Sequence, residues 1–316
     1  MSPANSAAPN SAPFNSVVTV RDALREAISR LRAAKIPSHT LAAELLLLHA
    51  TTRDRTWIYS HPEETLSPEI VASFFAQIEK RIQGIPVQHL TGKQEFWGLQ
   101  FEVTPDVLIP RPETEHLIEV ALDRLAVREI RAGRPPRLSG ENLRIVDVGT
   151  GSGCIAISLA KELPDAKIYA TDISQPALAI AERNANRLGF ADRIDFLASS
   201  LLDSVNSAAA TFDLLICNPP YIGFGERASL QPEVRDHEPA LALFGGKEGY
   251  ELYGALVSQA AQLLKPDGLL VLELGQGSLP FVYPLLETPH WTAIGVSNDL
   301  AGIARVLSAE RTKVSL

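Results

Sequence analysis

The sequence predicts an α/β protein in which a small helical domain precedes a doubly wound parallel sheet. From about residue 143 onward, apolar strand-like runs alternate with helical patterns and the connections are short, which is typical of a parallel sheet with helices on both faces. A chain of 316 residues is long enough for two domains. We therefore expect an N-terminal helical domain at 17–86, a β-hairpin linker at 87–110 and the α/β domain at 111–316.

Composition and charge restrict the class of protein. With 46% hydrophobic and 21% charged residues, the chain is expected to be globular. Its formal net charge of -8 comes from the second part: residues 1–86 contain 9 Lys/Arg and 8 Asp/Glu, whereas residues 87–316 contain 20 and 29. Proteins that bind duplexes normally present a basic stripe to the phosphates. Because the sequence shows no such stripe, we expect no direct nucleic-acid binding.

The cysteines and the first residues bear on location. Cys154 and Cys217 both lie in apolar runs, which indicates buried free thiols in a reducing cytoplasm. No stretch approaches the ~20 apolar residues that a membrane span needs, so no membrane association is expected. Residues 1–16 are rich in Ser, Ala, Asn and Pro and lack the regions of a signal peptide. We expect a cytoplasmic protein with a disordered N-terminal tail.

Three helices are predicted within residues 17–86. The first has Thr19 as its N-cap, the second begins near Ser38, and the third has Ser67 as its N-cap with Pro68 at the first helical position. No catalytic group of residues lies in this part. We interpret it as a substrate-recognition domain; the alternative is a stabilising cap.

The spacing of apolar residues also predicts the elements of the remaining chain. In the linker, Phe101 and Val103 alternate with polar residues, and Gly98 lies where a turn is expected. Strands are expected at 144–148, 167–171, 193–197, 212–217 and 268–273, with a terminal pair within 291–307. Helices are expected at 114–132, 154–163, 174–188 and 250–264.

The segment Asp147-Val-Gly-Thr-Gly-Ser-Gly153, here called the glycine turn, lies between an expected strand and an expected helix. A doubly wound sheet binds nucleotide-type ligands at such a place, and glycines let a ligand approach the backbone closely. The spacing G-x-G-x-G differs from the G-x-G-x-x-G that leaves a helix N-terminus for a pyrophosphate. It therefore favours S-adenosylmethionine, which has no phosphate, over a dinucleotide.

Asp172 ends the next strand, about twenty residues later, where a carboxylate can accept hydrogen bonds from both ribose hydroxyls. The predicted cofactor-binding residues are thus Gly149, Thr150, Gly151, Ser152, Gly153 and Asp172. Three alternatives stay open. The glycines could serve packing alone, Asp172 could be an ordinary helix N-terminal acid, and Asp147 could stabilise the turn without binding the cofactor.

Asn218-Pro219-Pro220-Tyr221, here called the Asn-Pro-Pro-Tyr loop, follows the apolar strand at 212–217. The prolines fix the backbone and remove two donors, so the Asn218 amide oxygen and the Pro219 carbonyl are expected to accept both hydrogens of a planar nitrogen. That orientation aims the nitrogen lone pair at a methyl group and stabilises the charge that develops. Tyr221 supplies a flat face for the acceptor.

These roles define the second set of predicted site residues. Asn218, Pro219 and Tyr221 are the catalytic candidates, and Pro220 joins them in binding the substrate. Asn218 is also expected to lie against the cofactor. The alternative is a proline turn that merely ends the strand.

Several segments together resemble the PrmC/HemK family, the protein-(glutamine-N5) methyltransferases that act on peptide chain release factors. The resemblance covers roughly residues 20–310. The segments that carry it are Leu90-Thr-Gly-Lys-Gln-Glu-Phe-Trp-Gly98, Val107-Leu-Ile-Pro-Arg-Pro-Glu-Thr-Glu115, the glycine turn, Asn218-Pro-Pro-Tyr-Ile222, Val234-Arg-Asp-His-Glu-Pro-Ala-Leu-Ala-Leu-Phe-Gly-Gly246 and Asp299-Leu-Ala-Gly302.

The resemblance implies a seven-stranded, Rossmann-like methyltransferase domain behind a helical domain and a β-hairpin linker. It implies S-adenosyl-L-methionine as methyl donor, S-adenosyl-L-homocysteine as product and no metal. The implied partner is a class 1 peptide chain release factor, methylated at N5 of the glutamine in its Gly-Gly-Gln motif in support of translation termination. The cofactor-binding and substrate-binding residues named above keep their roles by position.

One departure from the family concerns the adenine end of the cofactor. The family commonly has an acid followed by a bulky apolar residue after the third strand. Here Leu201 fills the apolar role and is counted among the cofactor-binding residues, but Ser200 stands in the place of the acid. Asp203 is a candidate substitute. Arg111 and Glu113 are candidates either for shaping the pocket or for surface ion pairs.

The main alternative is a nucleic-acid amino-methyltransferase, acting on adenine N6 or guanine N2, because such enzymes share the Asn-Pro-Pro-Tyr signature. The acidic second part and the family-specific segments Ile109–Glu115 and Glu238–Gly246 argue against it. A non-catalytic module that binds the cofactor and a dinucleotide oxidoreductase are weaker alternatives.

Overall fold

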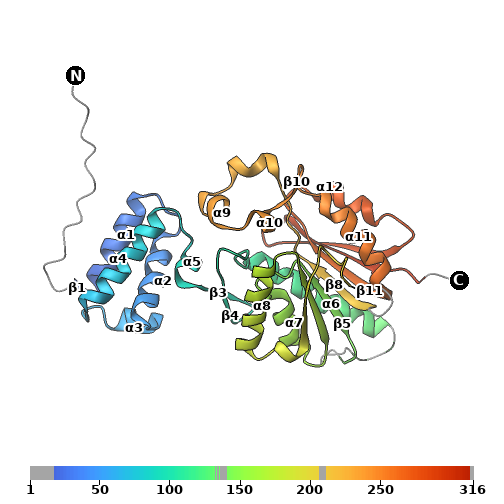
Figure 1. Ribbon diagram of the computed structural model, residues 1–316, viewed down its shortest axis with the longest axis horizontal. Helices are drawn as coiled ribbons and strands as arrows, with labels where there is room; N and C mark the ends of the chain where they lie inside the picture. The colour runs from blue at the N-terminus through green and yellow to red at the C-terminus, as the bar shows by residue number, and fades with distance from the viewer. Residues whose placement is uncertain (1–17, 132, 134, 136–140, 206–210, 314–316) are drawn as a thin grey trace, which may run out of the picture. The chain divides into compact units, whose positions relative to one another are not determined.

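The computed structural model describes residues 18–131, 133, 135, 141–205 and 211–313. Within these ranges the chain forms two compact units, which meet in sequence between Thr91 and Gly92 (Figure 1). The tail expected at residues 1–16 lies outside the described residues. Each unit has its own hydrophobic core, so each is described by itself.

The first unit is helical. Its elements are β1 (Val18–Thr19), α1 (Val20–Ala33), α2 (His39–Thr51), α3 (Arg55–Ser60), β2 (Thr65–Leu66), α4 (Pro68–Ile82) and α5 (Val87–Thr91). The predicted caps form: Thr19 Oγ1 accepts a hydrogen bond from the Asp22 amide at 3.2 Å, and Ser67 Oγ accepts one from the Ile70 amide at 3.4 Å. Leu31, Leu46 and Phe74 are buried in its core.

Two short helices of the first unit differ from the sequence prediction. Helix α3 was not expected, and α5 occupies residues that were assigned to the extended linker. Both are too short, at six and five residues, for a helical repeat of apolar positions to show. The hairpin proper begins only at Lys93.

The second unit contains the predicted seven-stranded sheet, which confirms the α/β, Rossmann-like fold class. In spatial order its strands are β12 (Trp291–Asn298), β13 (Ala304–Arg311), β11 (Leu264–Glu273), β8 (Phe212–Cys217), β5 (Arg144–Val148), β6 (Lys167–Asp172) and β7 (Ile194–Ala198). Strands β11, β8, β5, β6 and β7 run parallel, whereas β13 is antiparallel to both of its neighbours.

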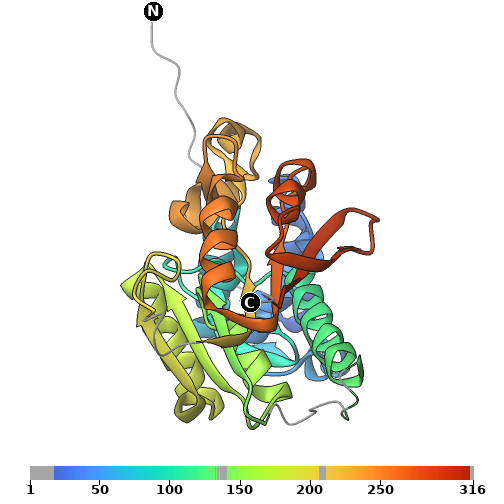
Figure 2. The same ribbon diagram turned by 90° about the vertical axis from the view of Figure 1, so that its right-hand side faces the viewer.

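Helices cover both faces of this sheet, as the two views in Figures 1 and 2 show. Both faces are apolar, as β5 shows: Ile145 packs in one hydrophobic cluster, and Val146 and Val148 pack in another. The first cluster includes residues of α6 (Glu115–Arg131), α7 (Cys154–Glu162) and α8 (Gln175–Leu188). The second includes residues of α11 (Glu251–Leu263) and α12 (Leu279–Val282).

The β-hairpin consists of β3 (Lys93–Phe96) and β4 (Leu99–Glu102) and belongs to the second unit. Trp97 and Gly98 form its turn, both with positive φ, as the glycine predicted. Phe96 and Phe101 are buried in the same cluster as α6 and α7. The hairpin is therefore part of the core of the α/β unit.

A long insertion separates β8 from α11. It contains β9 (Ile222–Gly223), η3 (Phe224–Ser229), α9 (Pro232–His237), α10 (Ala240–Leu243) and β10 (Phe244–Gly246). The short 3₁₀ helices η1 (Pro112–Thr114), η2 (Ala191–Arg193) and η4 (Tyr283–Leu286) complete the unit. The predicted strands at 144–148 and 212–217 are confirmed at both ends, but β13 runs four residues past the predicted end.

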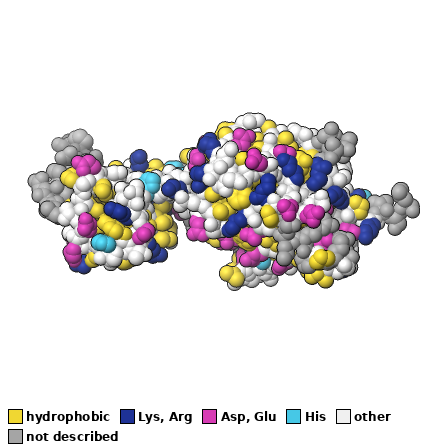
Figure 3. Space-filling view, turned by 90° about the horizontal axis from the view of Figure 1, so that it is seen from below, with side chains coloured by type: hydrophobic (Ala, Val, Ile, Leu, Met, Phe, Trp, Pro, Cys, Tyr) yellow, Lys and Arg dark blue, Asp and Glu magenta, His cyan; other side chains and the backbone are white. Residues whose placement is uncertain are grey.

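Charges of both signs lie interspersed over the larger unit on the face that Figure 3 shows. Cys154 and Cys217 are buried free thiols, and burial raises the pKa of the Cys154 thiol to about 12. Within the described ranges, no helix has the length and apolar character needed to cross a membrane.

Candidate active site

The glycine turn connects β5 to α7. The amides of Gly149 and Thr150 donate hydrogen bonds to the Thr171 carbonyl of β6, at 2.8 and 2.9 Å. Gly149 and Gly151 have φ of 72° and 55°, which side chains other than hydrogen disfavour. A Cβ atom at either position would meet no atom within 4 Å. These glycines therefore serve the backbone conformation and leave open space beside the turn, as a bound ligand requires.

Asp147 is the first residue of the glycine turn and is fully buried. Its Oδ2 accepts hydrogen bonds from Thr150 Oγ1 at 2.7 Å and from the Ala156 amide at 3.2 Å. Burial raises the pKa of this carboxyl to about 7. Of the two interpretations left open by the sequence, these contacts favour the turn-stabilising one.

Asp172 lies at the end of β6, next to the glycine turn. One carboxylate oxygen accepts a hydrogen bond from the Gly151 amide at 2.8 Å, and the other accepts one from the Ser174 amide at 2.9 Å. Burial raises the pKa of Asp172. The carboxylate thus fixes the glycine turn and the start of α8 at once. An open backbone turn beside a carboxylate to which none of the described cationic side chains is bonded fits the phosphate-free S-adenosylmethionine.

The turn after β7 contains the predicted adenine-side residues. Leu201 is half-buried against the second hydrophobic cluster and has φ of 47°. Ser200 is exposed, while Asp203 accepts a hydrogen bond from Gln259 Nε2 at 2.7 Å. Gln259 Oε1 accepts a hydrogen bond from the Leu202 amide at 3.1 Å. Asp203 therefore holds this turn against α11.

The Asn-Pro-Pro-Tyr loop begins beside the glycine turn because of strand register. Cys217 of β8 pairs with Val148 of β5 on one side and with Leu272 of β11 on the other. The residues that follow Cys217, Val148 and Leu272 are Asn218, Gly149 and Glu273, respectively. Parallel strands end at the same edge of a sheet, so the two predicted halves of the site meet there with an acid that the sequence analysis did not select.

Two consecutive hydrogen bonds connect Asn218 to that acid. Asn218 Nδ2 donates to Thr114 Oγ1 at 3.0 Å, and Thr114 Oγ1 donates to Glu273 Oε2 at 2.8 Å. The Tyr221 hydroxyl donates to the other carboxylate oxygen of Glu273 at 3.5 Å. Burial raises the pKa of Glu273 to about 7 and that of Tyr221 to about 12. Tyr221 is therefore a neutral hydroxyl donor at physiological pH.

The Asn-Pro-Pro-Tyr loop is also held by close backbone packing. Strand β9 follows the loop directly in sequence and pairs with β10. A Cβ atom on Gly245 would overlap the Pro220 carbonyl. A Cβ atom on Gly275 would lie 2.8 Å from the Tyr221 ring. Only glycine allows these approaches, so Gly245 and Gly275 let the neighbouring backbone pack closely against the loop.

An ion pair between a half-buried arginine and a buried glutamate joins the two family-specific segments. Arg111 Nη2 lies 2.6 Å from Glu238 Oε1, and the Ile109 amide donates to Glu238 Oε2 at 3.1 Å. The Glu238 side chain is 1% exposed. The pair therefore fastens the segment that carries Thr114 to the insertion after β8, which is more than a surface ion pair.

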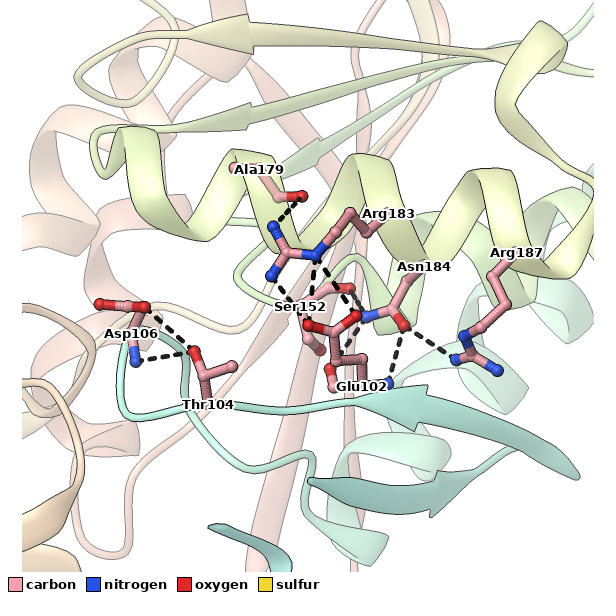
Figure 4. A network of polar contacts seen from close by, with 8 residues as sticks. All are labelled: Glu102, Thr104, Asp106, Ser152, Ala179, Arg183, Asn184 and Arg187. Atoms are coloured by element: carbon pink, nitrogen blue, oxygen red, sulfur yellow. Dashed lines mark hydrogen bonds and ion pairs between the residues drawn. The ribbon is translucent and has the colours of Figure 1, made fainter. Parts of the chain in front are cut away.

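A second polar network connects the hairpin to the glycine turn (Figure 4). Buried Asn184 of α8 accepts a hydrogen bond from the Glu102 amide at 2.7 Å and donates to the Glu102 carbonyl at 3.0 Å. Its amide nitrogen also donates to the Ser152 carbonyl at 3.0 Å. Arg183 pairs with the Glu102 carboxylate at 2.8 Å. Asn184 is thus a bridge from β4 to the predicted cofactor loop.

Four residues at the site were not selected from the sequence: Thr114, Asn184, Glu238 and Glu273. A signal existed for Glu273, because an acid directly after an apolar strand, Leu269-Leu-Val-Leu272, repeats the arrangement that singled out Asp172. Thr114 and Glu238 lie within segments that carried the family resemblance. Asn184 has no local signal, since its partners are 82 and 32 residues away.

Comparison with known proteins identifies the relatives of this chain. Residues 22–92 match the PrmC N-terminal domain, and residues 136–230 match the methyltransferase small domain. The release factor glutamine methyltransferase of Koribacter versatilis is 42% identical over 92% of this chain and 98% of its own length. That of Moorella thermoacetica is 43% identical, covering 82% of this chain and 86% of its own.

A solved structure extends the likeness to the fold. The catalytic domain of hMettl16, in complex with MAT2A 3'UTR hairpin 6, superposes with a TM-score of 0.54 at 18% identity, covering 73% of this chain and 82% of that one. At such low identity the likeness shows the fold alone. The extent of the sequence matches shows more: this chain belongs to the family of release factor glutamine methyltransferases.

Proposed function

We propose that this protein transfers a methyl group from S-adenosyl-L-methionine to the side-chain amide nitrogen of the glutamine in the Gly-Gly-Gln motif of class 1 peptide chain release factors. Relatives that match nearly the whole chain are release factor glutamine methyltransferases. The structural observation that carries the proposal is the register of β5, β8 and β11, which brings the Asn-Pro-Pro-Tyr loop to the glycine turn.

In this proposal the glycine turn and Asp172 hold the cofactor. Gly149 to Gly153 would face it with backbone, and the Asp172 carboxylate, which accepts a hydrogen bond from the Gly151 amide, would accept hydrogen bonds from its ribose hydroxyls. Leu201 provides apolar contact on the adenine side. The bound cofactor supplies an electrophilic methyl group on a sulfonium. The residues of the chain then have to aim the acceptor nitrogen at that group and exclude water.

The Asn-Pro-Pro-Tyr loop orients the acceptor nitrogen. An amide nitrogen is a weak nucleophile because its lone pair is delocalised into the carbonyl. The Asn218 Oδ1 and Pro219 carbonyl oxygens accept one glutamine N–H each, and among the described residues no donor is bonded to either oxygen. Fixed acceptors stabilise the positive charge that grows on the nitrogen. The bond from methyl to sulfur would break as the bond from methyl to nitrogen forms, and the nitrogen would then release one proton to solvent. Tyr221, held by Glu273, packs on the planar amide.

The helical unit completes the proposal as the part that recognises the release factor. A single glutamine offers little contact area, so selection of one protein requires further surface. Residues 17–86 contain none of the groups proposed for chemistry, and residues 22–92 match a domain characteristic of the family. We expect this unit to contribute to the KM for the release factor and not to cofactor affinity.

The test uses labelled S-adenosylmethionine and four acceptors in separate reactions: a class 1 release factor, its Gln→Ala motif variant, tRNA and duplex DNA. We expect label on the release factor alone, with mass spectrometry placing one methyl group on the motif glutamine. Label on tRNA or DNA without label on the release factor would refute the proposal and favour a nucleic-acid amino-methyltransferase.

A further inference from the structure

We propose that Thr114 and Glu273 are positioning residues that determine which end of the Asn218 side-chain amide faces the acceptor glutamine. The inference rests on the proposed function, in which Asn218 must present oxygen and not nitrogen. It concerns a residue pair that lies behind the Asn-Pro-Pro-Tyr loop and touches neither cofactor nor glutamine in the proposed arrangement.

The direction of the hydrogen bonds carries the argument. An ionised carboxylate only accepts, and a threonine hydroxyl has one hydrogen to give. Thr114 Oγ1 lies 2.8 Å from Glu273 Oε2, so its hydrogen is committed to the carboxylate. Only its lone pairs remain for Asn218, 3.0 Å away. Asn218 must therefore turn its NH2 group toward Thr114, which leaves Oδ1 for the substrate.

The flipped amide is disfavoured by the same contacts. It would place Asn218 Oδ1 against Thr114 Oγ1 with no hydrogen between two acceptors, in a place where water cannot compensate. Thr114 is 2% and Glu273 1% exposed, and leaving buried polar groups unpaired is costly. The flipped amide would also present NH2 to the glutamine NH2, donor against donor. The relay from Glu273 to Thr114 therefore selects the productive orientation before substrate arrives.

The ionisation state of Glu273 determines whether this relay operates. Burial raises the pKa of Glu273 to about 7, and the Thr114 hydrogen bond and the charge of Arg305 oppose that rise. The other titratable groups coupled to it are Glu113, Tyr221, Tyr253, Cys154 and Cys217. A protonated Glu273 has a hydrogen of its own to donate to Thr114, so the direction is no longer fixed. We expect the kcat of the wild-type enzyme to fall as pH decreases through about 7.

Thr114→Val tests the relay, with Thr114→Ser as the conservative variant and Thr292→Val, on an exposed residue of β12, as the matched control. At pH 8, kcat for release factor methylation should fall by about a hundredfold in Thr114→Val, largely return in Thr114→Ser, and stay unchanged in Thr292→Val. The cofactor Kd, measured by calorimetry, should stay within about threefold of wild type, which also shows that the variant is folded. Thr114→Val should lose the pH dependence assigned to Glu273.

A second readout distinguishes orientation from general disorder of the site. In Thr114→Val the freed amide can turn its NH2 group to the acceptor and so bind a carboxylate. The Gln→Glu variant of the release factor should therefore inhibit Thr114→Val more strongly, relative to the KM for the unmodified factor, than it inhibits wild type. A site that had merely loosened would bind both proteins less well.

Glu273→Gln provides an independent variant should Thr114→Val fail to fold. Its amide can donate to Thr114 and reverse the relay, so kcat should fall, and the double variant should be no worse than Thr114→Val alone. Any of three results would overturn the relay. The first is a wild-type kcat in both Thr114→Val and Glu273→Gln, and the second is an equal loss of kcat in Thr114→Ser and Thr114→Val. The third is that the Gln→Glu release factor inhibits Thr114→Val no more strongly, relative to KM, than it inhibits wild type. Failure of wild type to methylate the release factor would instead overturn the proposed function.

Discussion

The two halves of the site differ in how the chain holds them. The glycine turn is fixed by residues near it in sequence, since Asp147, Thr171 and Asp172 lie within one strand–helix–strand unit. The Asn-Pro-Pro-Tyr loop is fixed from afar: Asn218 bonds to Thr114, 104 residues earlier, and Thr114 bonds to Glu273, 159 residues later. The cofactor half is thus a local motif, whereas the acceptor half is a product of the tertiary fold.

The largest effect is expected from Asn218→Ala, which separates the two halves. Removing one of two acceptors should lower kcat by about 10²- to 10³-fold, while the glycine turn and therefore cofactor affinity are retained. Single-turnover transfer to the release factor and calorimetric titration of S-adenosylmethionine measure the two quantities. Asn186→Ala, on the exposed side of α8, is the control. Turnover near wild type in Asn218→Ala would remove the acceptor role from the loop.

The difference between the halves also explains what the sequence predicted. The glycine turn, its flanking elements and Asp172 follow from apolar periodicity and a glycine spacing within about 30 residues, and the strands β5 and β8 were predicted at their observed ends. The support of Asn218 could not be predicted in this way. Nothing near Thr114 in the sequence shows that its hydroxyl will reach Glu273, because that contact depends on the register of β8 and β11.

The errors in secondary structure have a related cause. Helix α5 was assigned to an extended linker because five residues hold too little of a helical repeat. Strand β13 extends to Arg311 through polar residues, which ended the apolar pattern early. One of these, Glu310, is buried and paired with Arg131 at 2.9 Å. A strand end that contains charged residues paired through tertiary contacts cannot be recognised from its hydrophobicity.

The next largest effect is expected from Asp172→Ala, which should weaken cofactor binding. The substitution removes the acceptor proposed for the ribose and also frees the Gly151 and Ser174 amides. Hydrogen bonds to charged groups contribute about 1.5–3 kcal/mol, so the cofactor Kd should rise roughly 10- to 100-fold. At saturating cofactor, kcat should stay within a few fold of wild type. Asp165→Ala, at an exposed position before β6, controls for the lost charge, and an unchanged Kd in Asp172→Ala would contradict the assignment.

Asn184→Ala tests whether the local half needs any distant support. Asn184 pairs with both polar backbone groups of Glu102 and with the Ser152 carbonyl (Figure 4). Leaving buried backbone groups unpaired costs about 1–3 kcal/mol, and the free energy of unfolding should fall by about that amount. The cofactor Kd should rise several-fold because Ser152 loses its tether. Asn186→Ala on the same helix should change neither the urea midpoint nor the Kd; equal behaviour of the two variants would show that the bridge is dispensable.

The smallest effect on activity is expected where the two halves share a property, since each contains a buried acid. Burial raises the pKa of Asp147 and of Glu273 to about 7, from ordinary values of 3.8 and 4.5. Between these limits the folded state holds protons that the unfolded chain has released, so the free energy of unfolding should decrease as pH rises toward 7. The slope is at most about 1.4 kcal/mol per pH unit for each proton.

Asp147→Asn keeps an acceptor for Thr150 and the Ala156 amide but cannot titrate, so urea unfolding of this variant should show a flatter pH dependence than wild type between pH 4.5 and 7. Carboxyls whose pKa is lowered, such as Glu102 beside Arg183, contribute the opposite slope at lower pH and are the same in both proteins, so the difference isolates Asp147. Glu273→Gln should flatten the curve as well, but with a loss of activity that Asp147→Asn does not share. If the free energy of unfolding of Asp147→Asn depends on pH as steeply as that of wild type, Asp147 is ionised in the folded protein. The two halves would then share a buried acid but not its raised pKa.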